Sequence, residues 1–172
     1  MVNLNPVEAV HAAITPPLSQ YARNMIAHLD LSAHPEGGWY KRTWQSPLEY
    51  ADSARPLASL IYFLLPEGDF SDWHLVDADE LWLWHGPAEV ELEVCDVDPR
   101  SLSADELKAQ TTRTVLSVRE NNAYGAAAQC LVRAGQWQRT LPTKSDALVS
   151  CVVCPGFTFD GFTVITEEDT CQ

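Results

Sequence analysis

Two histidines, three tryptophans and a run of acids are concentrated in the stretch 71–86, which reads SDWHLVDADELWLWHG. Within it, His74 and Glu80 are a candidate acid–base pair, because a nearby carboxylate raises the pKa of an imidazole and orients its ring. Such a pair can take a proton from a substrate and return it. The alternative is that the two side chains only satisfy each other in a polar cavity. Pockets combine apolar walls with a few placed polar groups, so the stretch predicts a binding pocket.

The spacing in this stretch predicts which side chains share a face. Alternate residues of a strand point to the same side. Unless a bulge in DADE shifts the phase, four side chains therefore face one side together: His74, Glu80, Trp82 and Trp84. His85 and Trp73 are expected to point the other way. The two tryptophans of the shared face are either pocket wall, where indoles stack on sugar rings or bases, or ordinary core and dimer contacts.

A second cluster of polar and aromatic residues occupies 34–46, HPEGGWYKRTWQS. Its two glycines mark a turn or a close backbone approach, and a strand is expected after them. Arg42 suits a bidentate contact with a carboxylate or phosphate group of a ligand. The alternative is that Arg42 and Lys41 are edge-strand charges. The other candidate ligand-binding side chains are two residues at the pocket mouth and two phenols, of which either could face the pocket: His34, Glu36, Tyr40 and Tyr62.

Composition argues against several classes of function. The chain has 172 residues, which fits one domain, and its 24 acids and 11 bases give a net charge of −13. This charge argues against a nucleic-acid partner and against an anionic membrane surface. No apolar run reaches the roughly 18 residues that span a bilayer, and the N-terminus lacks the segments of a signal peptide. We therefore expect a cytoplasmic protein.

The cysteines do not predict a disulfide framework, because their number, five, is odd and the expected compartment is reducing. Cys151 and Cys154 form a CxxC motif, but the motif lies in a predicted strand. Positions i and i+3 of a strand point to opposite sides, so we favour core thiols over a metal or redox site.

Hydrophobic periodicity predicts an all-β protein with one early helix. Apolar residues keep helical spacing up to Leu29, so a helix is expected over about 17–29. A second, short helix is expected at 103–109. Strands are expected at 39–45, 57–65, 71–76, 80–85, 88–95, 111–118, 129–133, 136–140, 147–154 and 162–166. Since β-α-β alternation is lacking, the chain should form a β-sandwich or barrel.

Several blocks resemble a largely uncharacterised group within the cupin superfamily that carries an HPEGG motif. The matching segments cover roughly half of the chain: 34–46, 59–86, VRAGQWQRT at 132–140 and LVSCVVCPGFTFDGFTV at 148–164. The resemblance implies a double-stranded β-helix, the cupin jelly-roll barrel, over 34–172, with an N-terminal helical extension over 1–33. It also implies a homodimer and a cavity at the barrel centre.

Many cupins bind iron, manganese, nickel or zinc through three histidines and a glutamate. The resemblance places these four ligand positions at His74, Val76, Glu80 and Gln138. Valine cannot bind a metal, and a carboxamide is a weak ligand for transition ions. No cofactor is therefore favoured, and Gln138 is expected to contact the ligand instead. A divalent metal would have to use His74 and Glu80, with His34 and Glu36 entering from the neighbouring block.

Three functions remain open from the sequence. The first is a metal-independent isomerase or epimerase that acts on a small polar metabolite through the His74–Glu80 pair. Sugar-nucleotide epimerases are related jelly rolls that use a histidine–acid pair and a tyrosine. The second is a non-catalytic module that binds a sugar, nucleotide or other small molecule. The third is a metal-dependent oxygenase or isomerase with an atypical ligand set.

Overall fold

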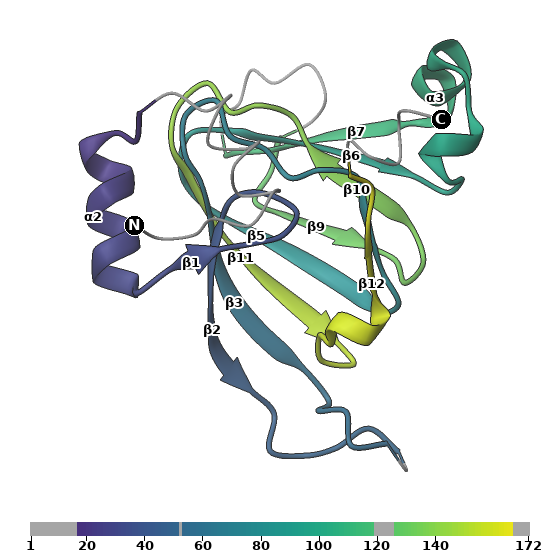
Figure 1. The fold of residues 1–172 in the computed structure, drawn as a ribbon, viewed down its shortest axis with the longest axis horizontal. Coiled ribbons are helices and arrows are strands. Elements are labelled where there is room, and N and C mark those ends of the chain that lie inside the picture. The colour runs from purple at the N-terminus through teal and green to yellow at the C-terminus, as the bar shows by residue number, and fades with distance from the viewer. Residues whose placement is uncertain (1–16, 52, 119–125, 167–172) are drawn as a thin grey trace.

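The computed structural model describes residues 17–51, 53–118 and 126–166, and the strands of these ranges form two six-stranded sheets (Figure 1). The first sheet has the order β1-β2-β3-β11-β5-β9, and all of its pairs are antiparallel. Its strands are β1 (Ser32–Ala33), β2 (Trp39–Gln45), β3 (Ser59–Leu65), β11 (Ala147–Cys154), β5 (Asp79–Pro87) and β9 (Gln129–Val132).

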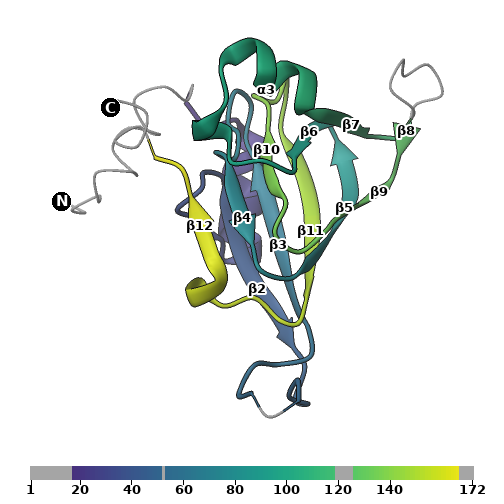
Figure 2. The ribbon, with the colours of Figure 1, turned by 90° about the vertical axis from the view of Figure 1, so that its right-hand side faces the viewer.

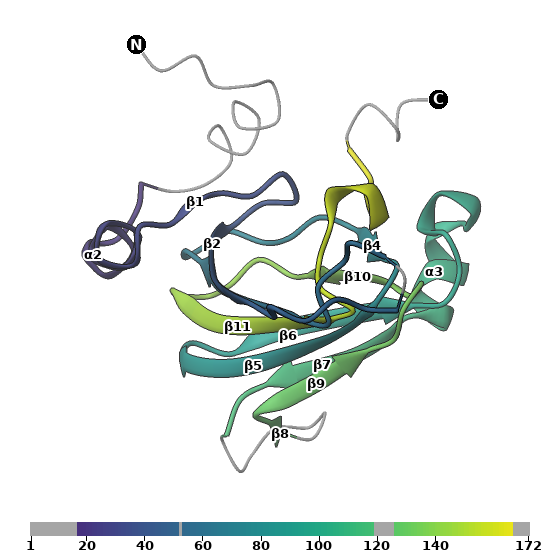
Figure 3. The ribbon, with the colours of Figure 1, turned by 90° about the horizontal axis from the view of Figure 1, so that it is seen from below.

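The second sheet has the order β12-β4-β10-β6-β7-β8 and is antiparallel except for the β7–β8 pair. Its strands are β12 (Phe162–Val164), β4 (His74–Val76), β10 (Trp137–Thr140), β6 (Val90–Cys95), β7 (Thr112–Leu116) and β8 (Ala126–Ala127). The two sheets face each other around a common interior (Figure 3). The predicted all-β jelly roll with an N-terminal helix is confirmed.

Strand register determines which side chains enter the interior, because directly paired residues of neighbouring strands point to the same side. Across the first sheet, from β2 to β5, one interior row contains Arg42, Ile61, Cys151 and Trp82. A second row, towards one end of the barrel, contains Ser59, Val153 and Glu80. A third row, in the opposite direction, contains Tyr40, Phe63, Val149 and Trp84. Polar and apolar groups are thus separated along the interior.

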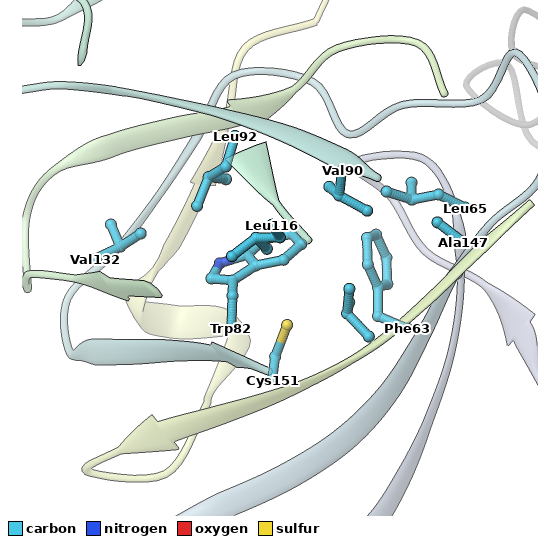
Figure 4. Packing of buried hydrophobic residues seen from close by; sticks show 10 residues of the cluster. Phe63, Leu65, Trp82, Val90, Leu92, Leu116, Val132, Ala147 and Cys151 are labelled. Atoms are coloured by element: carbon cyan, nitrogen blue, oxygen red, sulfur yellow. The ribbon is translucent and has the colours of Figure 1, made fainter. Parts of the chain in front are cut away.

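The largest hydrophobic cluster takes residues from both sheets. Trp82 of β5 packs edge-on against Phe63 of β3, with 5.8 Å between the ring centroids (Figure 4). Val90, Leu92 and Leu116 of the second sheet close the cluster from the other side. Each fully buried large side chain contributes about 1.5–3 kcal/mol to folding, so this cluster is a main source of stability.

Helix α2 (Gln20–Leu29) packs outside the first sheet, as predicted. Ser19 caps it by accepting from the Ala22 N–H, and the Ser19 hydroxyl also donates to Asp146, which ties the cap to the start of β11. The two-residue strand β1 follows the helix and pairs with β2. The predicted boundary between an extension at 1–33 and a barrel at 34–172 stays a prediction.

η1 (Pro99–Ser101) and α3 (Ala104–Gln110) follow β6, and α3 lies at one end of the second sheet (Figure 2). Leu102 and Leu107 pack against Trp73 and Trp137. Trp73 therefore points away from the cavity side of β4, as the parity of the strand predicts. The connection between β2 and β3 extends beyond the body of the barrel, and η2 (Phe159–Gly161) precedes β12 (Figure 2). In the described ranges, no helix has the length and apolar character needed to cross a membrane.

Candidate functional site

The HPEGG loop between β1 and β2 turns tightly back on itself. The His34 N–H donates to the Gly38 carbonyl at 3.0 Å, and the Gly37 N–H donates to the His34 carbonyl at 3.0 Å. Gly37 and Gly38 have φ values of 105° and 69°, a region that favours glycine. The Glu36 carbonyl accepts from the Asp72 N–H at 2.6 Å, two residues before His74. This turn and this backbone bond bring the loop against the start of β4.

Two imidazoles and one carboxyl group converge at this point. Oε2 of Glu36 lies 3.4 Å from Nδ1 of His34 and 3.4 Å from Nε2 of His74. Nδ1 of His74 lies 2.8 Å from the Asp72 carbonyl oxygen, which can only accept, so Nδ1 carries the hydrogen and Nε2 presents a lone pair. Nδ1 of His34 accepts from the Glu36 backbone N–H at 3.4 Å, so it also presents a lone pair. The Nδ1 lone pair of His34 is therefore used by the Glu36 backbone, and Nε2 of His74 is the free acceptor near Oε2 of Glu36.

Burial shifts the pKa values of this cluster in the directions that oppose charge on each group. It lowers the pKa of His34 to about 3, with a further contribution from His74. It lowers the pKa of His74 to about 4, although the hydrogen bond to the Asp72 carbonyl acts in the opposite direction. Burial raises the pKa of Glu36 well above its usual range, and the nearby Glu80 and Asp72 carboxylates raise it further. In its protonated form, Glu36 can donate its single carboxyl hydrogen to Nε2 of His74, while its backbone N–H occupies Nδ1 of His34.

Glu80 is a second buried acid, but it is held by a different set of groups. Its Oε2 accepts from Nε2 of Gln138 at 2.6 Å, and Oε1 of Gln138 accepts from the Trp82 indole N–H at 2.9 Å. Burial raises the pKa of Glu80, while the hydrogen bonds with Gln138 and Cys151 oppose that shift. In the described part of the chain, no hydrogen bond or ion pair joins Glu80 to His74. The carboxyl partner of His74 is Glu36, which corrects the predicted His74–Glu80 contact.

A small cavity of about 30 Å³ adjoins these groups. The polar part of its lining is His34, Glu36, Tyr40, Arg42, Ser59, His74 and Glu80, and the rest is Ile61, Val76, Cys151, Val153 and Phe157. About 10–15 Å³ of such volume holds one water molecule, so there is room for about two. A larger open hollow of about 300 Å³, between 87–91 and 141–145, contains none of the predicted site residues.

Four of the predicted ligand-binding residues lie outside this lining: Trp82, Trp84, Gln138 and Tyr62. Trp82 packs in the hydrophobic cluster, and Trp84 donates its indole N–H to the Ala88 carbonyl at 2.7 Å. Gln138 lies behind Glu80, and both ends of its amide are occupied. Positions 80, 82 and 84 share the interior face, but residues i and i+2 of a strand lie about 6.6 Å apart along its axis. The tryptophans therefore enter the core instead of the cavity.

The two candidate tyrosines are on opposite sides of the first sheet. Tyr40 lines the cavity, and its ring packs edge-on against His34 with 4.6 Å between centroids. Tyr62 lies near His85, with 6.3 Å between the ring centroids, and packs in the cluster beneath α2. The outward orientation predicted for His85 is confirmed by this contact and by its hydrogen bond with Ser150 at 2.6 Å.

An aromatic segment after β11 covers the histidines. The His34 ring contacts Phe159 in a stacked arrangement at 6.3 Å and Phe162 edge-on at 5.7 Å, and Phe157 lines the cavity. Cys151 is buried and Cys154 is exposed, as the CxxC parity predicts. Ser59, Cys151 and Val153 were not among the predicted site residues. The pairing of β3 with β11 identifies them, because it places Ser59 opposite Val153 and Ile61 opposite Cys151 on the interior face.

The residues do not fit the four-ligand metal site that the resemblance implies. Val76 is aliphatic and packs with Ala78 and Val153, and the Gln138 amide is committed to Trp82 and Glu80. Within the described ranges, no group of three or more histidine, cysteine, aspartate or glutamate side chains is arranged to hold a metal ion. No step of the chemistry proposed below therefore passes through a metal.

Two facing sheets with one buried polar site define a jelly-roll barrel of the cupin type. The family described as "Cupin superfamily (DUF985)" matches residues 23–165, and the chain belongs to this family. Protein SO0799 from Shewanella oneidensis is similar, with 31% identity, 86% of this chain and 85% of that chain covered, and a TM-score of 0.72. A hypothetical protein from Leishmania major is 26% identical, covers 86% of this chain and 89% of its own, and has a TM-score of 0.67.

A more distant likeness concerns the fold alone. An oxalate decarboxylase from Lactobacillus farciminis is 13% identical, with 80% of this chain and 34% of that chain covered and a TM-score of 0.52. A search of the curated proteins found no match. The homodimer implied by the family resemblance stays a prediction.

The buried cluster should give the protein a stability optimum between about pH 4.5 and 6.5, the usual pKa values of its acids and histidines. Below this window the unfolded histidines bind protons that the folded ones do not, so the free energy of unfolding decreases as the pH is lowered. Above it the folded acids hold protons that the unfolded ones release, so the free energy falls as pH rises. Each such proton changes the free energy of unfolding by about 1.4 kcal/mol per pH unit.

Urea denaturation at half-unit pH steps tests this expectation. Other carboxylates also contribute below pH 4.5, so the informative quantity is the difference between the wild type and His34→Phe. We expect the free energy of unfolding to fall less steeply with decreasing pH in His34→Phe than in the wild type. An identical acid limb in both proteins would mean that His34 is not held neutral in the folded state.

Proposed function

We propose that the cavity is the active site of a metal-independent enzyme that moves a proton on a small polar metabolite, as an isomerase or epimerase does. The observation that supports this proposal is the Glu36 carboxyl group, whose Oε2 is 3.4 Å from Nε2 of His74, a nitrogen that presents a lone pair. An acid and a base in direct contact at the end of a cavity are the components that general acid–base catalysis requires.

The proposed chemistry uses Glu36 as acid and His74 as base. Burial raises the pKa of the Glu36 carboxyl group and so favours its protonated, proton-donating form, as in apolar enzyme sites. A substrate carbon next to a carbonyl would give its proton to Nε2 of His74, while the carbonyl oxygen takes the Glu36 proton. Return of the two protons to other positions completes an isomerisation. The Asp72 carbonyl holds the His74 ring in the tautomer that accepts.

The size of the cavity restricts the substrate. Pockets for drug-sized ligands measure about 300–1,000 Å³, whereas this cavity measures about 30 Å³. A whole nucleotide sugar would require displacement of Phe157 and the aromatic segment around it. A metabolite of a few carbon atoms needs a much smaller adjustment, so we favour the smaller class.

The test is hydrogen exchange at carbon in deuterated water. The protein is incubated with a panel of hydroxy acids, sugar acids and nucleotide sugars, and proton NMR follows loss of the signal α to the carbonyl. We expect exchange with at least one small compound, and a loss of about 10²–10⁴-fold in His74→Asn. His85→Asn, on the outer face, is the matched control and should retain the rate.

Two results would replace this proposal. Saturable binding in the cavity with no exchange for any compound would favour a non-catalytic binding module. Stoichiometric iron, manganese, nickel or zinc in the purified protein, lost in His74→Asn and retained in His85→Asn, would favour the metal-dependent alternative.

A further inference from the structure

We propose that the substrate of this site is a small carboxylate, whose carboxylate group binds Arg42 at the cavity mouth and the buried Ser59 beside Phe157 while its polar carbon faces Glu36 and His74. The proposal rests on the proposed function, because it assigns a substrate class to the same site. It depends on a second set of groups, at the mouth of the cavity, which the proton-transfer chemistry does not use.

Arg42 supplies a permanent positive charge at the mouth. Its Nη2 donates to the Phe157 carbonyl at 3.1 Å and its Nη1 donates to Oε1 of Gln45 at 3.2 Å. A guanidinium has five N–H donors, so in the described part of the structure these two bonds leave three for a ligand. The guanidinium also lies 5.9 Å from the centroid of the Phe157 ring, which holds its plane at the edge of the cavity. A planar fork of this kind matches a carboxylate.

Ser59 supplies a second, buried donor beside Arg42. Its Oγ accepts from the Phe157 N–H at 2.9 Å, and the Phe157 carbonyl accepts from Arg42, so the two side chains flank one residue. Ser59 is only 1% exposed and lines the cavity. No acceptor for its hydroxyl hydrogen is found among the described residues. A buried hydroxyl that can still donate is well suited to the second oxygen of a carboxylate.

The charges of the interior favour an anionic end at the mouth and a neutral end inside. Burial opposes charge on the two histidines and on Glu36 and Glu80, so a neutral part of the ligand suits this inner wall better than a second anionic group does. Arg42 is the only arginine or lysine that lines this cavity in the described ranges. The cavity volume of about 30 Å³ limits the inner part of the ligand to one or two heavy atoms beyond the carboxylate.

Calorimetric titration of the full-length protein tests the inference with three probes of one size: glycolate, its neutral amide glycolamide, and inorganic phosphate. We expect glycolate to bind at least tenfold more tightly than glycolamide or phosphate. Arg42→Gln should weaken glycolate binding at least tenfold and leave glycolamide within twofold. Arg42→Lys, which keeps the charge and loses the fork, should fall between. Arg100→Gln removes the same charge at Trp137 on the outer face and should change nothing.

The outcomes separate this inference from the proposed function. Equal binding of glycolate and glycolamide, tighter binding of phosphate, or an unchanged preference in Arg42→Gln would overturn the carboxylate assignment. If a neutral compound exchanges its proton in a His74-dependent way without any effect of Arg42, the proposed function stands and this inference fails. If Arg42-dependent carboxylate binding occurs without exchange, the inference stands and the proposed function fails.

Discussion

Replacement of Glu36 by glutamine should lower the exchange rate about 10²–10⁴-fold while the protein remains folded. The glutamine amide has nearly the same size and can donate to Nε2 of His74, and the backbone N–H of residue 36 still donates to His34, so the local hydrogen bonding survives. It cannot release a proton, so the proposed acid is lost. The same variant should be more stable than the wild type above pH 6.5, because burial raises the pKa of Glu36 and ionisation of this group opposes folding there.

Glu80→Gln is the matched variant, because Glu80 is also buried and its pKa is also raised. Glu80 is hydrogen-bonded to Gln138 and does not contact His74, so we expect a smaller loss of exchange, below tenfold. NMR exchange rates and urea denaturation at pH 7 and pH 9 measure both effects. If Glu80→Gln abolishes exchange and Glu36→Gln does not, the pair predicted from the sequence is the functional one.

The second large effect is expected at Gly38, where alanine should destabilise the fold by about 2–4 kcal/mol. A Cβ at this position would lie 2.6 Å from Cζ of Phe63 and 3.1 Å from the Leu64 carbonyl oxygen. Phe63 is 1% exposed and packed against Trp82, so it has little room to move. The φ of 69° adds backbone strain for a residue with a Cβ.

Gly135→Ala provides the control for strain alone. Gly135 has a similar φ of 80°, but a Cβ there would meet nothing within 4 Å. We expect it to cost about 1–2 kcal/mol, so the two variants should differ by the packing contribution. Urea midpoints at constant m-value measure the difference. Equal losses at the two glycines would show that contact with Phe63 is not what restricts Gly38.

Much of the architecture follows from local patterns in the sequence. The apolar spacing before Leu29 predicts α2, and Ser103 with Glu106 forms a capping box at α3, where a short helix was expected. Alternation predicts β6, whose Val90 and Leu92 are buried in the core. These patterns are reliable because each depends on residues within one element, and a strand or helix repeats its burial with its own period.

The family blocks also identify the site region. Of the ten predicted site residues, six line the cavity: His34, Glu36, Tyr40, Arg42, His74 and Glu80. The matching family blocks at 34–46 and 59–86 contain these six residues. The resemblance does not say how far each residue lies along the barrel, which is why Trp82, Trp84 and Gln138 were also expected there. Depth along the barrel depends on the register of strands that are distant in sequence.

The sequence by itself therefore determined most strand positions along the chain, the alternation of burial within single strands, and the segments that carry the candidate site. Only the tertiary structure decided which carboxyl group meets His74. Glu36 reaches His74 because two glycines allow the HPEGG loop to turn back and because the Glu36 carbonyl accepts the Asp72 N–H across two distant segments. Glu80, although six residues from His74 along the chain, is on the opposite sheet, where Gln138 holds it. Contacts of this kind arise when the sheets close, because neither segment alone contains both partners.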